Sequence, residues 1–261
     1  MRLPALVLAS LVGAAFAAPA IVRYPPDHLD LDARRQPPSA AHWFGTDDLG
    51  RDVVARVLYG ARVSLGVGLL SAAVAGISGT GIGGVAGYAG GALDAVLMRG
   101  TDAMLAVPRL PLLMIAASIL QPTVGVLVVL IGLAGWMETA RVLRAEFMTL
   151  RTRGFVESAR AAGAGHARLV MVHLLPNAAH ALIVSVTLAV ARGILLESAL
   201  SFFGVGVRPP QASWGNMLYQ AQSSLTTEPW LAVAPGLFIL ITTWSVNLVG
   251  DGLSRSRSSQ P

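Results

Sequence analysis

Long uncharged stretches alternate with short charged segments along most of the chain. A helix needs about 20 apolar residues to cross the roughly 30 Å hydrocarbon core of a bilayer. The pattern predicts six such helices, at about residues 3–22, 63–93, 101–120, 124–143, 178–203 and 230–249. We therefore expect an all-α, polytopic membrane protein.

The third and fourth predicted helices come from one long uncharged stretch. It holds 28 residues between Arg109 and Glu138 and is interrupted by Gln121-Pro122-Thr123 near its middle. This length exceeds one span but is short for two. We interpret it as a tight hairpin in which each helix carries one charged turn into the membrane interface.

The first apolar stretch permits two interpretations. Residues 1–22 are long enough to form an uncleaved transmembrane helix. A basic start and the small residues of segment 15–18 (Ala-Phe-Ala-Ala) also resemble a secretory signal with a cleavage site after residue 17. The apolar stretch continues through Val22, which favours the uncleaved helix. Cleavage would leave every later segment on the same side of the membrane.

Composition agrees with a membrane location and excludes several chemistries. Hydrophobic residues make up 54% of the chain and charged residues 13%, whereas soluble domains carry about 25% charged residues. All 19 basic residues are arginine, so the chain has no lysine for a phosphate-binding P-loop or a Schiff base. The absence of cysteine excludes disulfides and thiolate metal sites. We therefore expect no catalytic residue and no nucleotide hydrolysis by this chain itself.

The arginines predict the orientation in the membrane. With the N-terminus in the cytoplasm, eleven of them fall inside and seven outside, as the positive-inside rule requires. The inside arginines lie at the start, in a loop near 91–109, in segment 141–177 and in the tail, which includes Arg257. Six arginines between residues 23 and 62 are matched by six aspartates, so we expect ordered extracytoplasmic structure there. Arginines scattered between spans, without an aromatic platform, exclude a nucleic-acid binder.

Segment 151–177 has the most specific local pattern. Small residues favour a short helix from about Phe155 to Ala162, and Gly163 and Gly165 break it. A second helix is expected from His166 to Leu174, ending at Pro176. On composition alone, an amphipathic loop lying on the membrane surface fits equally well.

The order of residues in this segment resembles the EAA loop of ABC importer permeases. In that family the loop is a cytoplasmic helix–turn–helix that docks into a groove of an ATPase subunit. The matching residues are Glu157, Ser158, Ala159, Ala162, Gly163, Leu175 and Pro176. Ser158 replaces the middle alanine of the loop's name, and His173 stands where other branches often have isoleucine.

Five further blocks resemble the C-type permease of dipeptide, oligopeptide and nickel importers. They follow in the family's order and cover residues 44–52, 59–65, 195–204, 209–215 and 247–253. Because several independent blocks match together, coincidence is a poor explanation. The resemblance extends over about residues 42–253.

The resemblance implies an architecture and a set of partners. It implies a type I ABC importer core of five helices at 63–253, with the coupling loop at 151–177. An N-terminal helix (1–22), an extracytoplasmic segment (23–62) and a cytoplasmic tail (254–261) complete the expected chain. The implied partners are a homologous B-type permease, two ATPases that use ATP and Mg²⁺, an extracytoplasmic substrate-binding protein and membrane lipid. The implied location is the bacterial inner membrane, with both termini cytoplasmic and no cofactor on this chain.

The cargo implied by the resemblance is a short peptide. Nickel chelates, haem or another small solute remain alternatives, because the binding protein largely selects the substrate in such importers. A stand-alone channel is the alternative outside this class, although the coupling loop would then have no use. A membrane-embedded hydrolase has no support, because the sequence lacks His-Glu-x-x-His and Gly-x-Ser-x-Gly.

Two ionisable residues fall within the fifth predicted span, and such residues are functional candidates. Arg192 and Glu197 lie about 140° apart on a straight helix, so they do not form a simple pair. We expect Arg192 to meet another subunit or to line the translocation path. Glu197 either faces the extracytoplasmic mouth of the path or packs inside the chain.

Two other groups of polar residues are better interpreted as structural than as binding sites. His166, His173 and His180 recur every seven residues, but no carboxylate repeats with them, so we expect interfacial histidines and no metal site. Arg99 and Asp102 are helix neighbours near Asp94. We interpret this group as structural, or as a second contact with the ATPase.

Overall fold

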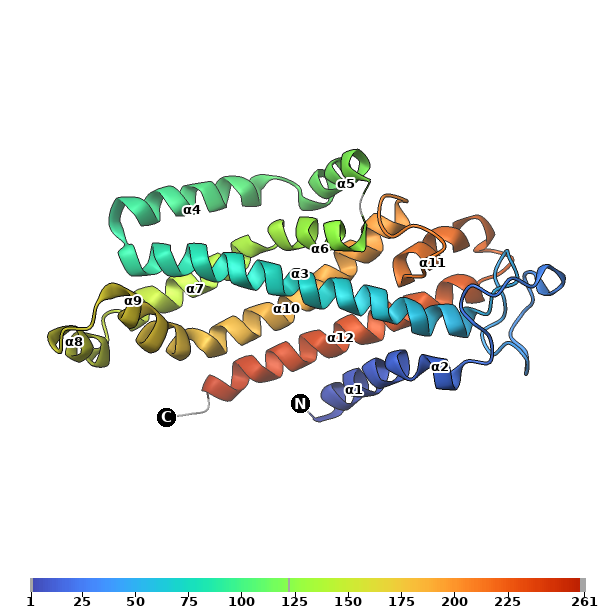
Figure 1. Cartoon of the computed structure of the whole chain (residues 1–261), viewed down its shortest axis with the longest axis horizontal. Coiled ribbons are helices and arrows are strands. Elements are labelled where there is room, and N and C mark those ends of the chain that lie inside the picture. Colours follow the sequence, from blue (N-terminus) through green and yellow to red (C-terminus); the bar gives the residue numbers. More distant parts are fainter. Residues whose placement is uncertain (1, 122, 259–261) are drawn as a thin grey trace.

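The computed structural model describes residues 2–121 and 123–258, with side chains as far as Arg255, and folds as an elongated helical bundle (Figure 1). The longer helices are α1 (Arg2–Phe16), α3 (Val53–Ala89), α4 (Gly91–Ala106), α5 (Arg109–Leu120), α6 (Val124–Leu133), α7 (Trp136–Leu150), α10 (Leu175–Phe202) and α12 (Trp230–Ser258). Shorter ones are α2 (Ala18–Ile21), α8 (Gly154–Ala161), α9 (His166–Arg168) and α11 (Trp214–Ala221). The all-α expectation is confirmed, while Pro122 and the side chain of Arg257 lie outside the described part.

Three uninterrupted helices are long and apolar enough to cross a membrane, namely Val53–Ala89, His166–Phe202 and Trp230–Arg255. The pairs α4–α5 and α6–α7, bent by 82° and 43°, raise the number of candidate spans to five within the described residues. The sequence predicts six. A turn at Ala17 separates α1 from α2, so residues 3–22 do not form the expected continuous helix.

The predicted loop at 91–109 is wrong. Gly90 and Gly91 have positive φ values of 68° and 58°, and this sharp turn leads from α3 directly into α4. The predicted helix over 101–120 is broken instead at Val107 and Pro108. Proline has no N–H to donate and forces the preceding residue into an extended conformation, as the ψ of 127° at Val107 shows.

The helix that begins at His166 does not end at Pro176, so that prediction is also wrong. It runs through a π-helical turn (Leu169–Leu174) into α10. In this wider turn the N–H of Leu175 donates to the carbonyl of Val170, five residues back. Pro176 then lies in the first turn of α10. Its missing N–H costs no hydrogen bond there, because residues of the first turn do not donate within the helix.

Helix α3 lies at the centre of the bundle because its glycines let other helices come close. A Cβ on Gly79, Gly83 or Gly87 would lie within 2.8 Å of α7 backbone atoms. The close helix packing expected from the glycine-rich sequence is therefore confirmed between α3 and α7. The helix begins at Val53, ten residues before the predicted start, because Asp52 caps it by accepting a hydrogen bond from Ala55 N at 2.8 Å.

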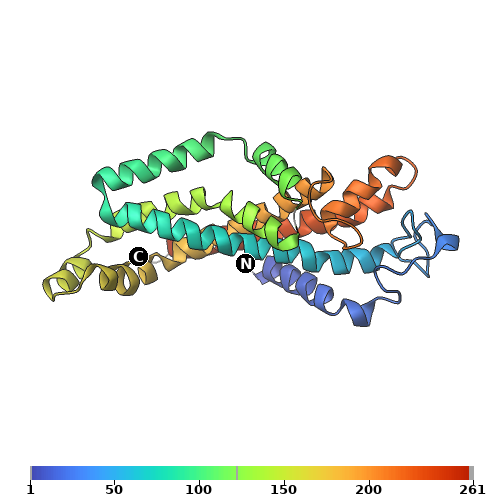
Figure 2. The ribbon, with the colours of Figure 1, turned by 45° about the horizontal axis from the view of Figure 1, so that its top comes forward.

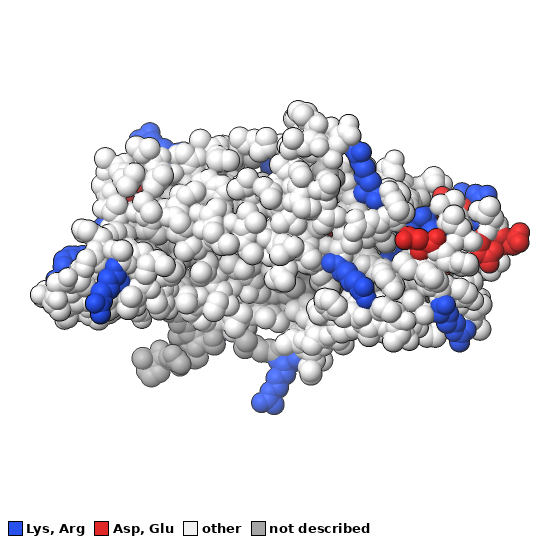
Figure 3. Space-filling model, in the orientation of Figure 1, with Lys and Arg blue, Asp and Glu red and all other residues white. Residues whose placement is uncertain are grey.

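Two regions outside the long helices mark the opposite ends of the bundle (Figures 1 and 2). Residues 23–52 lie at one end, beside the start of α3 and near α11. Residues 151–165, which include α8, lie at the other end. On the face shown in Figure 3 carboxylates gather at the 23–52 end, arginines project at both ends, and most of the surface between them is uncharged.

Candidate functional site

Helix α8 is held against the bundle by one buried side chain. Val156 has no exposed surface and packs in a cluster with Phe147 and Leu150 of α7 and Leu169 and Leu174 of the π-helical segment. This cluster joins α8 to the two long helices on either side of it. A displacement of α8 would therefore be passed directly to α7 and α10.

The turn after α8 has the hydrogen bonds of a Schellman motif. Gly163 N–H donates to Arg160 O, and Ala164 N–H donates to Ala159 O, both at 3.0 Å. Gly163 has a φ of +86°, a conformation that residues with a Cβ rarely adopt. Ala159 and Ala164 both pack on the apolar cluster around Val156, as the motif's usual hydrophobic contact requires.

The residues predicted to contact an ATPase lie mostly on the outer surface of this end. Glu157, Ser158, Ala162, Gly163 and Pro176 are exposed, and Ala159 and Leu175 are partly buried. Glu157 lies in the first turn of α8, where a carboxylate is favoured by the helix dipole. The described residues leave this surface free to meet another protein.

The sequence pattern misses two contacts that fix the loop to the end of α3. Tyr88 Oη and His166 Nδ1 are hydrogen-bonded at 2.5 Å, and Arg151 donates to Tyr88 O at 3.1 Å. No local pattern links these positions, since Tyr88 is only the last aromatic residue of a glycine-rich span. Among the described residues no group of three or more His, Asp or Glu side chains could hold a metal ion.

Glu197 lies in the interior of the chain. Its side chain is fully buried and accepts hydrogen bonds from Ser64 Oγ and Ser201 Oγ, each at 2.8 Å. Ser64 in turn accepts a hydrogen bond from Trp214 N at 3.2 Å. Glu197 therefore joins α3, α10 and α11 through these hydrogen bonds.

Arg192 points away from Glu197 and is part of a different group. Its side chain is 39% exposed, and its NH1 lies 3.9 Å from Oε1 of Glu138 on α7. Glu138 also accepts a hydrogen bond of 2.5 Å from Arg109. The structure thus separates the two candidate path residues, with Arg192 on a surface and Glu197 inside.

Helices α4 and α7 are tied together by ion pairs that the sequence pattern misassigns. Arg144 donates to both oxygens of Asp94, at 2.5 and 2.7 Å, and Arg141 donates to Asp102 at 2.5 Å. Asp102 therefore reaches across to α7, not to its helix neighbour Arg99. These pairs support the structural interpretation of the group.

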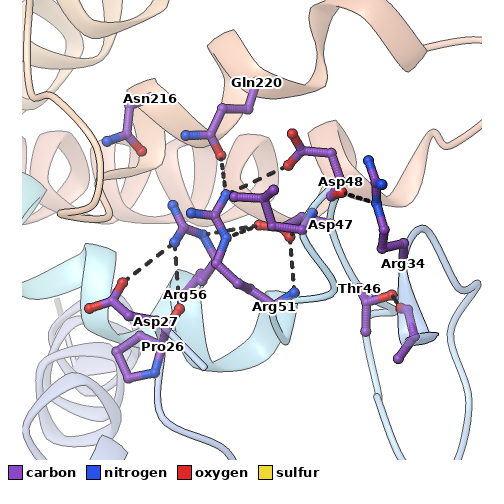
Figure 4. Close-up of polar contacts among 12 residues, drawn as sticks. Pro26, Asp27, Arg34, Thr46, Asp47, Asp48, Arg51, Arg56, Asn216 and Gln220 are labelled. Atoms are coloured by element: carbon purple, nitrogen blue, oxygen red, sulfur yellow. Dashed lines mark hydrogen bonds and ion pairs between the residues drawn. The ribbon is translucent and has the colours of Figure 1, made fainter. Parts of the chain in front are cut away.

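A network of charged side chains orders residues 23–52 (Figure 4). Arg51 donates to Asp47 Oδ2 at 2.6 Å and to Gln220 of α11 at 3.1 Å. Arg56, only 1% exposed, lies 3.5 Å from Asp47 Oδ2 and 3.8 Å from Asp27 Oδ1. The balanced arginines and aspartates of residues 23–62 thus pair in an ordered arrangement, and the network also fastens α11.

Comparisons with known proteins agree with one another. Over 249 residues the chain is 41% identical to a peptide permease protein of Brucella suis biovar 1, covering 95% of this chain and 82% of the relative. It is 36% identical over 248 residues to the oligopeptide transport system permease protein OppC of Bacillus subtilis (95% and 81%). It is 38% identical over 224 residues to the dipeptide transport system permease protein DppC of the same organism (85% and 70%).

A comparison with solved structures and a comparison with family models point to the same kind of protein. A solved structure of the MetNI methionine ABC transporter, with inward-facing conformations, superposes with a TM-score of 0.63 at 19% identity, over 77% of this chain and 95% of that one. Residues 79–256 match the model of the family described as binding-protein-dependent transport system inner membrane component. The chain belongs to this family and is a permease subunit of an ABC importer.

Proposed function

We propose that this chain forms one half of the translocation path of an ATP-driven importer of short peptides. A homologous B-type permease supplies the other half. Two partner ATPases bind and hydrolyse ATP with Mg²⁺, and an extracytoplasmic binding protein delivers the peptide. The peptide class is supported by the names of the relatives, which describe peptide, oligopeptide and dipeptide permeases.

The observation that carries the proposal is the exposed surface of α8, on a helix clamped to two long helices. Glu157 and Gly163 lie on that surface, while Val156 fixes α8 to α7 and to the helix leading into α10. Closure of two ATPases against this surface would move α8 and, with it, the helices that line the path. We accordingly place residues 151–165 in the cytoplasm of a bacterium, at the inner membrane. Residues 23–52 then lie outside, and both chain termini are cytoplasmic.

The test is a charge reversal on α8 in the complete transporter. Glu157→Lys introduces a cation at the positive end of the helix dipole and removes the carboxylate offered to the ATPase. We expect the subunit to insert normally but to lose ATP-dependent tripeptide uptake in proteoliposomes, with fewer ATPase subunits co-purifying. Gly163→Pro is expected to act in the same way, because proline cannot adopt the φ of +86° at that position.

The matched control is Arg208→Glu, a charge reversal on an exposed residue near the opposite end of the bundle. It is expected to leave the co-purification of the ATPases unchanged. Wild-type coupling and uptake in the Glu157→Lys transporter would contradict the assignment of α8 as the coupling helix.

A further inference from the structure

A groove runs along α10 between α7 and the end of α12. Its volume is about 340 Å³. Glu138 and Val142 of α7 line one side, Ser254 of α12 lines the other, and His180 and Arg192 of α10 lie along the floor.

The charged end of the groove lies among the apolar helices, well before the end of α10. Arg192 is ten residues before the end of α10, about 15 Å along a helix and so about half the thickness of the hydrocarbon core. The side chains of Arg192 and Glu138 remain 39% and 31% exposed there. Because a charged group facing hydrocarbon at this depth is costly, this face of the chain turns toward water or toward polar groups, not lipid.

The polar atoms of the groove are incompletely paired within the chain. Oε2 of Glu138 and Nε2 of His180 are buried and have no hydrogen-bond partner in the described part of the molecule. The ion pair of Arg192 with Glu138 is long, at 3.9 Å, so its guanidinium retains donors for another group. Oε1 of Glu138 already accepts a hydrogen bond from Arg109 at 2.5 Å and has a second lone pair left for a donor of a ligand.

We propose that this groove is the peptide-binding surface that the chain contributes to the path. Arg192 donates hydrogen bonds to carbonyl or carboxylate oxygens of the peptide, and Glu138 accepts them from an amide N–H or the terminal ammonium. These groups occur in every peptide, so the contact tolerates any side chain. Twelve residues separate His180 from Arg192, about 18 Å of helix, which is the length of about five extended residues. The inference rests on the proposed function for its peptide class.

The absence of cysteine from the chain permits a direct test. In the complete transporter, Val142→Cys places a single thiol of this chain in the groove, and Ile77→Cys places one on an exposed, apolar part of α3. A charged methanethiosulfonate reagent reaches a thiol only through water. It reacts with the thiolate, which forms only where water contacts the thiol. We expect the groove thiol to react at least about tenfold faster than the control thiol, and millimolar trialanine to slow that reaction several-fold.

Reaction is followed with and without ATP and vanadate, so that both states of the transporter are sampled. A groove thiol that reacts as slowly as Ile77→Cys in both states would overturn the proposal. Cross-linking of that thiol to the second permease in both states would assign the groove to the subunit interface, with the same consequence. Fast reaction that trialanine does not slow would also overturn it.

Neutral variants test the two charged residues. Glu138→Gln and Arg192→Gln are each expected to raise the KM for tripeptide uptake by about five- to tenfold while changing kcat little, because each loses one contact with the bound peptide. The matched control is Arg141→Gln, which removes an ion pair from the same helix but outside the groove. It is expected to keep the wild-type KM, and an equal rise in all three variants would show a structural role.

Failure of this inference can be told from failure of the proposed function. If the chain does not belong to a peptide importer, the wild-type complex shows no ATP-dependent uptake of tripeptide. If only the groove is misassigned, wild-type uptake persists, while the groove thiol is unprotected or the neutral variants keep the wild-type KM.

Discussion

The two ends of the bundle are held together by different forces. At the 151–165 end, Val156 fixes α8 through apolar contacts with Phe147 and Leu169. At the 23–52 end, Arg51 and Arg56 fix an almost helix-free segment through contacts with aspartates (Figure 4). One end is therefore clamped by packing and the other by charge.

This difference fits what each end has to do. Apolar contacts are non-directional and survive small rotations, so a helix held by them moves together with its neighbours. Charge-assisted hydrogen bonds have narrow geometry and define one arrangement of a segment that has little core of its own. These forces suit the proposed function, in which the 151–165 end transmits movement and the 23–52 end keeps its shape.

The largest expected effect comes from removing the buried cation of the 23–52 end. Arg56→Ala leaves Asp47 with one partner fewer and opens a cavity, because Arg56 is among the largest fully buried side chains. We expect a loss of about 3 kcal/mol of stability, seen as a lower melting temperature and as proteolysis within residues 23–52. The exposed Arg34, replaced by alanine, is the control and should change either measurement little. An unchanged melting temperature in Arg56→Ala would show that charge does not hold this end.

A smaller effect is expected from weakening the apolar clamp. Val156→Ala removes two methyl groups from a fully buried site and should cost about 2 kcal/mol of local stability. Hydrogen exchange of α8 should then speed up while residues 23–52 keep their protection. Phe155→Ala removes a larger but 41% exposed side chain and serves as control. Equal protection of α8 in Val156→Ala and the wild type would contradict the clamp.

The smallest of the three effects isolates the backbone of the turn. Gly163→Ala adds a Cβ where nothing lies within 4 Å, so its whole cost is the φ of +86°, about 1 kcal/mol. Gly154→Ala also faces open space but has no positive φ, and it should be neutral or slightly stabilising. The melting temperatures of the two variants test this difference. Equal melting temperatures would show that the positive φ of Gly163 carries no cost for alanine.

The sequence anticipates the features that local chemistry decides. Gly163 indicates the turn after α8, because a left-handed residue after a helix is usually glycine. The predicted span 230–249 lies within α12, and the predicted span 178–203 ends one residue after α10, as their uninterrupted apolar stretches require. The sequence predicts a start of α3 that is too late, because Arg56 and Arg62 interrupt the apolar stretch and resemble loop residues. In the structure Arg56 meets aspartates and Arg62 donates to the carbonyls of Ala15 and Phe16.

The contacts that sequence reasoning missed depend on how helices are rotated against one another. Arg192 and Glu138 are 54 residues apart, and no local periodicity says that they face the same groove. The same applies to Tyr88 and His166, whose contact depends on where α3 ends relative to the loop. Glu197 could be recognised as an intramembrane charge, but its serine partners come from α3 and from its own helix.

The π-helical turn at Leu169–Leu174 gives the junction between loop and span a stepwise mechanical character. Its N–H groups reach one residue further back than in an α-helix, so one surplus residue is stored in the turn. Returning that turn to α-helical bonding would screw the preceding helix by one residue relative to α10, about 1.5 Å along the axis and about 100° around it. A force on α8 would therefore shift the helix in steps of one residue, and would not bend it continuously.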